Sequence, residues 1–472
     1  MLELIPNGQT RRDVICRMGA GLGGLALGNL LHEQSALAAN SMTNARGPHR
    51  APRAKAVIQL FMHGGPSHVD LLDPKPMLSK YDGKTPPSEV VDDEKRTKHL
   101  VQTPFRFQQC GESGIPFSEV MPKISEHADE IAVIRSMHSV HRNHEQAIRM
   151  SQTGLTMSGR PTLGAWVTYG LGNENQNLPG YMVLPDPGGL PVDGIRNWSS
   201  GWLPPKFQGT QVRSSGSPIL YLKPPKERSA SVDAGRLDLL RILNKKHLES
   251  RPGEAELEAR IANFELAARM QLSATDALDY SQETAATQEL YGLNNKKTKS
   301  YGTRCLMARR LVERGVRFVQ ILMAGQPWDT HSDNVNRTRD CCAQTDGPVG
   351  ALLTDLKQRG LLDSTLVFWG GEFGRTPGAE LRVAGQPHGR DHHPYGFSVW
   401  MAGGGVKGGQ AYGATDDFRY RSIEKRVSFA QLHATMLHLL GLDHESLTWH
   451  HNGRDERLTD VFEVEPIREL IG

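Results

Sequence analysis

Six apolar runs of four to seven residues alternate with helical patterns along the chain, and this alternation constrains the fold most strongly. The apolar runs cover residues 56–62, 131–135, 181–184, 317–322, 365–369 and 397–401. Helical patterns occupy residues 145–153, 237–277, 304–314, 349–359 and 429–440. Strands that alternate with helices are typical of an α/β fold. We therefore expect a mostly parallel central sheet with helices on both faces.

The length and charge limit the domain organisation and the class of partner. A chain of 472 residues can form one large α/β domain or two ordinary ones. We expect a single domain over residues 55–472, with the helical pattern at about 235–282 as an excursion outside the sheet. The net charge of only +3 indicates no extended basic face, so nucleic acid is not an expected partner.

The N-terminus has the order of features found in an export signal. A twin-arginine pattern at residues 10–15 precedes an apolar, glycine-rich run at 18–31 and a small-residue cleavage motif at 36–38. These features predict a signal peptide over residues 1–38, a flexible linker over 39–54, and a partner in the twin-arginine export machinery. The apolar run is too short for a stable membrane span. We expect a periplasmic or secreted protein; an ordinary amphipathic helix is the alternative.

Polar segments rich in histidine and carboxylate lie at the ends of the strongest strands, where open parallel sheets form their sites. They contain His63, Ser67, His68, Asp70, Ser139, His144, Asp329, His331, Glu372, Arg375, Arg390, Asp391, His392 and His393. Mixed imidazole and carboxylate ligands suit Zn, Mn or Fe, whereas Ca and Mg prefer oxygen alone. No CxxC pair is present, so a cysteine zinc site is not expected. A polar network that only closes the sheet ends is the alternative.

Two further patterns allow more than one interpretation. An arginine fork at Arg375 or Arg390 matches a phosphate or sulfate oxyanion, but either side chain could instead pair with a neighbouring acid. Ser67, His68 and Asp70 have the composition of a hydrolytic triad. Because neighbours in sequence rarely face one another as a triad requires, we expect Ser67 and His68 only to line the site.

Long motifs resemble a large family of exported bacterial proteins that is known mainly as a secreted domain of unknown function. The matching segments are FMHGGPSHVDLLDPKP, IRSMHSVHRNHEQAIRMSQTG, QPWDTHSDN, LLDSTLVFWGGEFGRTP and GRDHHPYGFSVWMAGGGVKGGQAYGATDDF. That family is placed in the alkaline phosphatase–sulfatase superfamily. The resemblance implies an alkaline phosphatase-like sheet with one or two divalent metal ions at the strand ends, Zn or Mn before Ca or Mg.

The resemblance also implies roles for particular residues. Asp329 and His331 resemble an Asp/His metal pair, with His393 or His392 as the late histidine of that site. A second ion, or the substrate, would contact Glu372, His63 and His144, and Arg375 would take the ester oxyanion. The side chains expected to bind substrate are His68, Asp70, Arg390 and Asp391.

The nucleophile is where the sequence departs from sulfatases. No C-x-P-x-R motif exists, so a formylglycine sulfatase is not expected. His144 stands at the corresponding helix start and could be a metal ligand or the nucleophile. The available hydroxyls are Ser67 and Ser139, and a metal-bound hydroxide is the alternative.

Two function classes follow. The first is a metal-dependent hydrolase of sulfate or phosphate esters, acting on a small molecule or a polysaccharide. The second is a non-catalytic protein that binds sulfated or phosphorylated polymers, for which the basic and aromatic loop at 197–226 could serve.

Overall fold

The structure, a computed structural model, describes residues 47–87, 99–175, 177–212, 230–251, 257, 261, 276–380 and 387–472. The predicted signal peptide at 1–38 lies outside the described residues, as does the linker up to residue 46. Most of the loop at 197–226 that could bind polymers also lies outside them, because the description stops at residue 212. These features therefore stay predictions.

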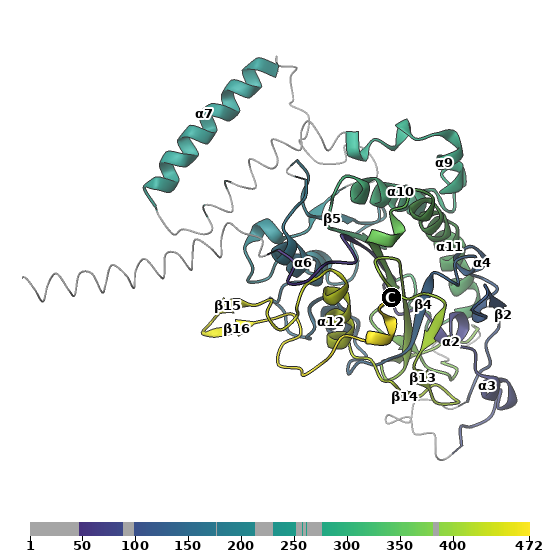
Figure 1. Cartoon of the computed structure of the whole chain (residues 1–472). Helices are drawn as coiled ribbons and strands as arrows, with labels where there is room; N and C mark the ends of the chain where they lie inside the picture. The colour runs from purple at the N-terminus through teal and green to yellow at the C-terminus, as the bar shows by residue number, and fades with distance from the viewer. Residues whose placement is uncertain are drawn as a thin grey trace, which may run out of the picture.

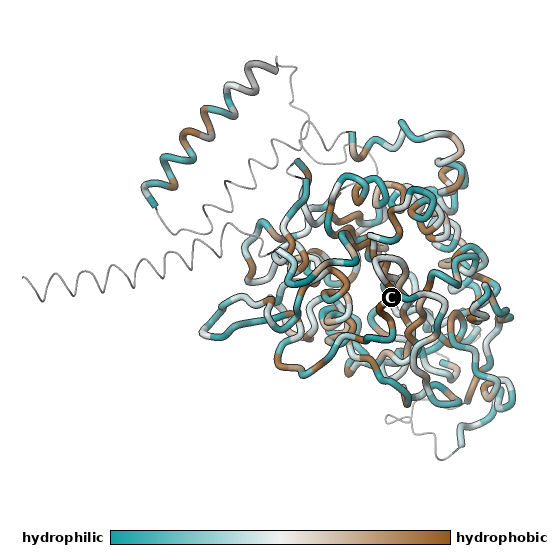
Figure 2. The backbone as a smooth tube through the Cα atoms, in the orientation of Figure 1, coloured by the Kyte–Doolittle hydropathy of each residue, from teal (hydrophilic) through white to brown (hydrophobic). Residues whose placement is uncertain are grey.

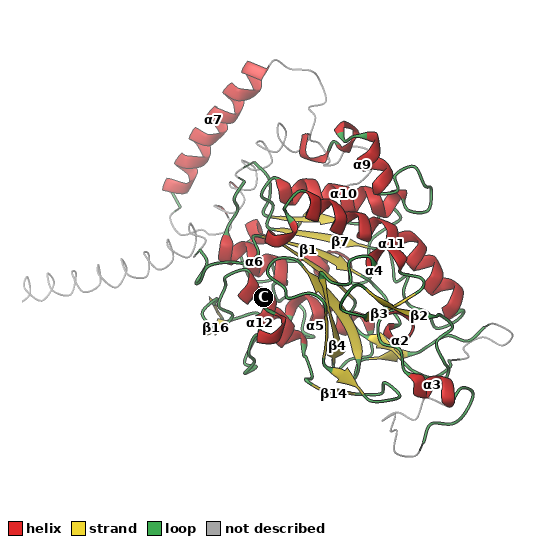
Figure 3. Ribbon diagram, turned by 45° about the vertical axis from the view of Figure 1, so that its right-hand side comes forward, coloured by secondary structure: helices red, strands yellow, loops and turns green. Residues whose placement is uncertain are grey.

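An eight-stranded sheet forms the centre of the molecule (Figures 1 and 3). Its order is β12 (Gln410–Tyr412), β4 (Ile131–Met137), β11 (Phe397–Ala402), β8 (Thr365–Gly370), β1 (Ala56–Phe61), β7 (Phe318–Leu322), β5 (Tyr181–Leu184) and β6 (Thr210–Gln211). Every neighbouring pair is parallel except the two that β11 makes, with β4 and β8. The expected α/β class with a mostly parallel sheet is confirmed, and all six expected strands form.

Helices cover both faces, as expected. The described helices are α2 (His68–Leu71), α3 (Pro76–Lys80), α4 (Pro122–Ser125), α5 (His144–Thr153), α6 (Leu163–Leu171), α7 (Ala230–Glu249), α9 (Ala285–Leu290), α10 (Lys299–Glu313), α11 (Asn334–Gln358) and α12 (Phe429–Leu439). Along β1, Ile58 and Leu60 join a core with α4, α10 and α11, while Val57 and Phe61 join a second core with α5, α6 and α12. This two-sided burial is why β1 is apolar at nearly every position.

Short elements complete the fold. The two-stranded pairs are β2 (Phe107–Cys110) with β3 (Ile115–Ser118), β9 (Gly374–Arg375) with β10 (His392–His393), β13 (Ala414–Thr415) with β14 (Ser422–Glu424), and β15 (Trp449–His451) with β16 (Arg454–Glu456). Five 3-10 turns are described: η1 (Gly194–Trp198), η2 (Pro205–Phe207), η3 (Tyr280–Gln282), η4 (Leu362–Ser364) and η5 (Arg468–Leu470). Among these short elements, the β9–β10 pair positions part of the site.

Several short helices were not expected, and two longer ones, α11 and α6, differ from expectation in an informative way. Helix α11 begins at Asn334, well before the expected start at residue 349, and continues through Gly347 and Pro348. Glycine and proline suggested a break there, but packing buries Cys341, Cys342 and Thr345 in this first half and overrides their propensity. Helix α6 was not expected. It is buried along almost its whole length, so it carries no amphipathic signal.

Helix α7 lies in the expected excursion and stands apart from the body in both views (Figures 1 and 3). Its exposed apolar residues include Leu239, Leu240, Ile242 and Leu243. Hydrophobic and hydrophilic positions alternate along the tube of α7 in Figure 2. Residues 252–256, 258–260 and 262–275 are outside the described part, so the single-domain organisation with this excursion stays a prediction. No helix within the described ranges is both long and apolar enough to cross a membrane.

Candidate metal centre

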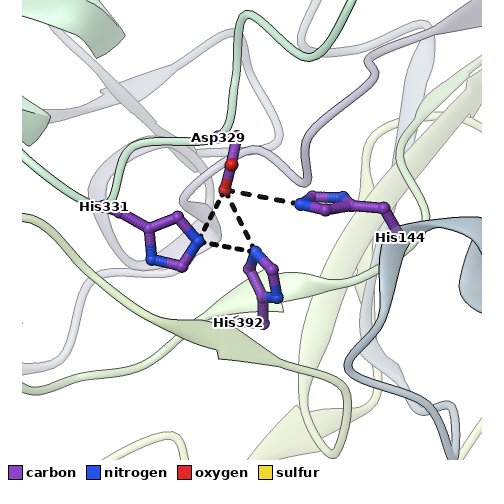
Figure 4. A group of neighbouring side chains, drawn as sticks. All are labelled: His144, Asp329, His331 and His392. Atoms are coloured by element: carbon purple, nitrogen blue, oxygen red, sulfur yellow. Dashed lines mark hydrogen bonds and ion pairs between the residues drawn. The ribbon is translucent and has the colours of Figure 1, made fainter. Parts of the chain in front are cut away.

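Four side chains from three distant parts of the sequence converge at one edge of the sheet (Figure 4). Asp329 and His331 lie in the loop between β7 and α11, and His144 is the first residue of α5, which follows β4. His392 lies in β10, just before β11. Because β11 is the reversed strand, its beginning reaches the edge at which β4 and β7 end. The reversal therefore brings the three segments together.

The ligand atoms of these residues lie close to one another. Asp329 Oδ1 is 2.9 Å from His331 Nε2, 3.0 Å from His392 Nε2 and 3.5 Å from His144 Nε2. His331 Nε2 and His392 Nε2 are 2.8 Å apart. Ligands of a tetrahedral zinc ion at 2.0–2.1 Å are separated by about 3.3 Å. The group therefore has nearly the spacing that a single ion requires.

In each of the three histidines, the Nδ1 atom contacts an acceptor on the side of the ring that faces away from the other ligand atoms. The Nδ1 atom of His144 lies 2.7 Å from Glu372 Oε1, and that of His392 lies 2.7 Å from the Arg142 carbonyl oxygen. The Nδ1 atom of His331 contacts Glu380 Oε2. All three partners are acceptors, so each Nδ1 carries the proton and each Nε2 presents a lone pair. Metal-binding histidines are held in this way, with the second nitrogen donating to a carboxylate or carbonyl.

The close Nε2 atoms of His331 and His392 need a cation between or beside them. Two lone pairs at hydrogen-bond distance repel each other unless one nitrogen is protonated or both bind a metal. Burial holds the pKa of His392 down at about 4, which favours the neutral ligand form. Burial also opposes protonation of His331, but its contacts with the carboxylates of Asp329 and Glu380 outweigh burial and raise its pKa. Both carboxylates favour positive charge at this place, and a divalent ion bound to the two Nε2 atoms would supply it.

Asp329 is the anionic member of the group. Burial opposes its ionisation, but contacts with the three histidine rings and the charge of Arg375 hold its pKa well below the ordinary range. Gly64, with φ +109°, packs on the Asp329 backbone; a Cβ there would lie 2.4 Å from the Asp329 amide nitrogen. The glycine after His63 thus lets the end of β1 support the aspartate loop.

The two adjacent histidines have different surroundings. In the β9–β10 pair, His392 opposes Arg375 and His393 opposes Gly374. Successive residues of a strand point to opposite faces. His392 therefore enters the four-residue group, while His393 is buried on the other side with its Nε2 atom 2.7 Å from the Tyr420 carbonyl oxygen. Of the two expected alternatives for the late histidine, the geometry places His392 beside Asp329.

Arg375 lies next to the group but is enclosed by protein. Its side chain is fully buried and donates to the carbonyl oxygens of Gly64, Gly65 and Arg390 and to Asp329 Oδ1 at 2.6 Å. All three guanidinium nitrogens are therefore occupied. This arrangement fits an arginine that holds the aspartate loop in place better than one that receives an ester oxyanion.

Glu372 and His63 lie behind the group rather than in it. Glu372 is fully buried and its Oε1 accepts from the Gly64 amide at 2.9 Å as well as contacting His144. His63 is buried with its Nε2 atom 3.3 Å from Asn197 Oδ1, and burial lowers its pKa to about 4. The structure does not bring these two residues among the four grouped ligands, although Glu372 contacts one of them.

The other expected residues form a network deeper in the protein. Ser67 Oγ donates to Asp70 Oδ2 at 2.6 Å, without His68 between them. The His68 Nδ1 atom instead accepts from the Arg375 amide at 3.3 Å. Asp70 is held by both ends of the Arg390 fork, at 2.9 and 3.0 Å. These contacts are not those of a hydrolytic triad, and Asp70 and Arg390 satisfy each other.

Ser139 is also turned away from the group. It is 4% exposed, and its Oγ lies 3.2 Å from the sulfur of Met150. Of the two hydroxyls considered as nucleophiles, the other, Ser67, is 1% exposed. The geometry thus presents neither hydroxyl to the four grouped residues.

Glu380 was missed by the sequence analysis. With His331 and Asp391 it forms a second, smaller group of possible ligands. It reaches this place because residue 380 pairs with Gly389 across an antiparallel bridge. No motif or periodicity surrounds Glu380, so only the folded geometry reveals it. Asn334, which donates to Asp70 at 2.8 Å, was missed for the same reason.

A family model matches residues 54–471, nearly the whole described part of the chain. The family is described as "Protein of unknown function (DUF1501)". The chain belongs to this family. No curated protein matches the sequence.

Several solved structures share the general arrangement of this DUF1501 protein at low similarity. The PsFucS1 sulfatase from Pseudoalteromonas sp. is 13% identical, with 87% of this chain and 72% of that chain covered and a TM-score of 0.36. An alkaline phosphatase superfamily protein from Vibrio parahaemolyticus is 11% identical, with coverage of 86% and 71% and a TM-score of 0.35. The periplasmic domain of EcEptC from Escherichia coli, in complex with Zn, is 9% identical, with coverage of 84% for both chains and a TM-score of 0.35. At such scores the likeness carries no argument about chemistry, which must come from the residues.

Proposed function

We propose that this DUF1501 protein is a metal-dependent hydrolase of sulfate or phosphate esters. The single observation that carries the proposal is the convergence of three outward-oriented Nε2 atoms on Asp329 Oδ1. Asp329, His331 and His392 would hold the ion, because their mutual distances are the shortest of the group. A nitrogen-rich set favours Zn or Mn over Ca or Mg.

The site is placed to receive an anionic substrate. The side chains of His144, His392 and Asp329 are 12%, 15% and 21% exposed, so the group is recessed but accessible from solvent. His144 is the first residue of the ten-residue helix α5, whose N-terminal end carries partial positive charge. An ester oxyanion at this edge would therefore meet the helix terminus as well as the ion.

His144 would act on the reacting oxygen. Its Nδ1 contacts the fully buried carboxylate of Glu372, and this contact fixes the orientation of the imidazole ring. A carboxylate behind a histidine fixes the tautomer and leaves Nε2 able to take or give a proton. We assign His144 as the general acid or base and Glu372 as its positioning residue.

The bound ion would polarise the ester and lower the pKa of the attacking water. The chain supplies the rest. Neither Ser67 nor Ser139 faces the group, which favours water over a protein hydroxyl as the nucleophile. The buried ring of Phe373 lies 5.0 Å from that of His144 and 4.6 Å from that of His392, so it packs against both imidazoles.

The twin-arginine pattern supports export of the folded chain with its ion already bound, so we place the protein in the periplasm or outside the cell. The ester could belong to a small molecule or to a polysaccharide.

The experiment combines metal analysis with an ester screen. The mature protein, purified without added metal, is expected to contain about one equivalent of Zn or Mn. It should hydrolyse p-nitrophenyl phosphate or p-nitrophenyl sulfate, and activity should be lost with a chelator and return on adding the metal. A folded protein that binds no divalent metal would sink the proposal. So would hydrolysis that persists unchanged in Asp329→Ala.

A matched pair of variants separates the roles. His392→Ala is expected to lose both metal and activity, whereas His144→Ala should keep the metal and lose activity. If His144→Ala also loses the metal, His144 is a ligand and the assignment of a general acid or base to it is wrong.

A further inference from the structure

A second cluster of charged side chains surrounds Asp73, outside the metal centre. Lys75 Nζ and Arg135 Nε lie 3.7 and 3.8 Å from Asp73 Oδ1, and an Arg419 Nη2 atom contacts Asp73 Oδ2. The four side chains are 14%, 17%, 0% and 4% exposed for Lys75, Arg135, Arg419 and Asp73. Three cations thus share one carboxylate in a place that excludes most solvent.

Nearby acids do not restore neutrality. Asp70 is the next carboxylate that faces Arg419, but both of its oxygens are held by the fork of Arg390, which brings a fourth cation with it. Asp416 faces Lys75, and its carboxylate accepts from three backbone amides, those of residues 418, 420 and 421. Buried charges in proteins are normally paired, because an unpaired one loses its hydration without compensation. The described residues therefore leave an excess of positive charge here.

Three buried hydrogen-bond donors in this cluster have no acceptor among the described residues. They are Arg135 Nη2, Arg419 Nη1 and His68 Nε2. The Nδ1 atom of His68 accepts from the Arg375 amide, so the neutral ring carries its proton on Nε2. Arg419 and His68 are 0% and 1% exposed, so bulk water cannot satisfy them.

The donors belong to one neighbourhood. Arg135 and Arg419 both contact Asp73, whose amide donates to the carbonyl of His68 at 3.1 Å. Burial is the main cause that lowers the pKa of His68, and the charge of Arg419 is the next. Burial also lowers the pKa of Arg419 to about 10, and the charge of Arg135 contributes. These effects describe cations that repel one another in a low-dielectric place.

We propose that this cluster is a binding site for a small inorganic anion, which accepts hydrogen bonds from Arg135, Arg419 and His68. An anion supplies both the missing negative charge and the missing acceptors. The site is separate from the metal centre, because the backbone of Arg375 lies between them, with its amide on His68 and its guanidinium on Asp329. The anion would stabilise the fold and would not react.

The test measures thermal unfolding of the mature protein at constant ionic strength. Sodium gluconate, whose anion is too large for a buried site, is replaced stepwise by chloride, bromide, sulfate or phosphate. A bound anion raises Tm with the logarithm of its concentration above Kd, by a few degrees per hundredfold. The halides and the tetrahedral anions distinguish a small monatomic site from a larger one, and either result supports the proposal.

Variants separate site binding from general salt effects. Arg135→Met is expected to abolish the dependence on the anion. Arg317→Met is the matched control, because Arg317 has a similar exposure of 14% and its own acid, Glu174, at 2.8 Å. In the control, Tm should fall by the same amount in every salt, so the increase of Tm with anion concentration should remain. Sulfate stabilises most proteins by exclusion from their surface, so the difference between the two variants decides.

Crystals soaked in bromide provide a measurement that needs no variant. An anomalous peak is expected beside Arg135 and Arg419 if the site takes halide. The proposal is overturned if Tm is the same in gluconate and in every test anion. It is also overturned if Arg135→Met keeps the full dependence on the anion.

Discussion

His331 and His392 hold their Nε2 atoms 2.8 Å apart, while the Nδ1 atom of each ring is engaged on the opposite side by Glu380 and by the Arg142 carbonyl oxygen. Two lone pairs in that position are repulsive in a neutral site. A divalent ion bound to both Nε2 atoms would remove this repulsion. This relationship, more than the number of histidines in the chain, is the reason to expect a metal.

Asp329→Asn should remove the anionic ligand while keeping its size. We expect loss of the metal and a fall in kcat/KM of at least about 100-fold, since an amide binds divalent metals weakly and leaves the positive charge of Arg375 unbalanced. Metal content and ester hydrolysis measure this. Asp340→Asn, at an exposed carboxylate 56% accessible on α11, is the control and should change neither quantity. Retention of stoichiometric metal in Asp329→Asn would contradict the assignment.

The neighbouring histidines provide a second comparison. His392→Ala should lose metal and, in the metal-free protein, should lower the free energy of unfolding less than His393→Ala, because His392 is 15% exposed and borders solvent whereas His393 is 1% exposed. His393→Ala should keep metal but lose about 1–3 kcal/mol of stability, because it removes the hydrogen bond that the buried imidazole donates to the Tyr420 carbonyl. Denaturant unfolding and metal analysis of both variants check this, and the reverse pattern would place His393 in the site.

Glu380→Gln tests whether the carboxylate at His331 Nδ1 orients and strengthens that histidine as a metal ligand. The amide can still accept from His331, but it no longer strengthens the ring as a ligand, so metal affinity should fall about 10–100-fold. Competition with a fluorescent zinc chelator gives the affinity. Glu289→Gln, at an exposed residue of α9, is the control. An unchanged affinity in Glu380→Gln would show that the contact is incidental.

His433 predicts a pH dependence of stability outside the metal centre. It is buried in α12, with its Nε2 donating to the Ser151 carbonyl, and burial lowers its pKa from 6.5 to about 4. Between those pH values the unfolded chain binds the proton more readily, so stability falls as pH falls from 6.5 towards 4. The loss from this group should approach about 3 kcal/mol. His433→Gln should reduce the pH dependence of ΔG in urea unfolding by about one proton; an unaltered slope would rule out the effect.

The sequence predicted the six strands and the edge at which the site lies, because strand signals are local and parallel strands end together. It could not choose between His392 and His393, since that choice depends on the register of a two-residue pair, β9 with β10. The alternatives for Arg375 were equally open, because its partners are carbonyl oxygens of loops whose path only the fold determines. Glu380 had no local signal at all.

The sequence also failed to predict that α11 begins at Asn334, for a different physical reason. Its first half is polar and precedes a glycine and a proline, so local propensity opposes a helix there. Asp346 in that half accepts from the amides of Lys123 and Ile124 at the start of α4, a contact 222 residues away for Ile124. Such long-range contacts decide the helix, and a single sequence does not reveal them.

The two-residue pairing of β9 with β10 has a consequence for how this site could vary. A slip of one residue in that ladder would turn His392 away from Asp329 and bring His393 towards it, because the faces of a strand alternate. The tandem histidines therefore present an imidazole in either register. A neighbouring insertion or deletion that shifts this short ladder by one position would exchange the ligand rather than abolish it.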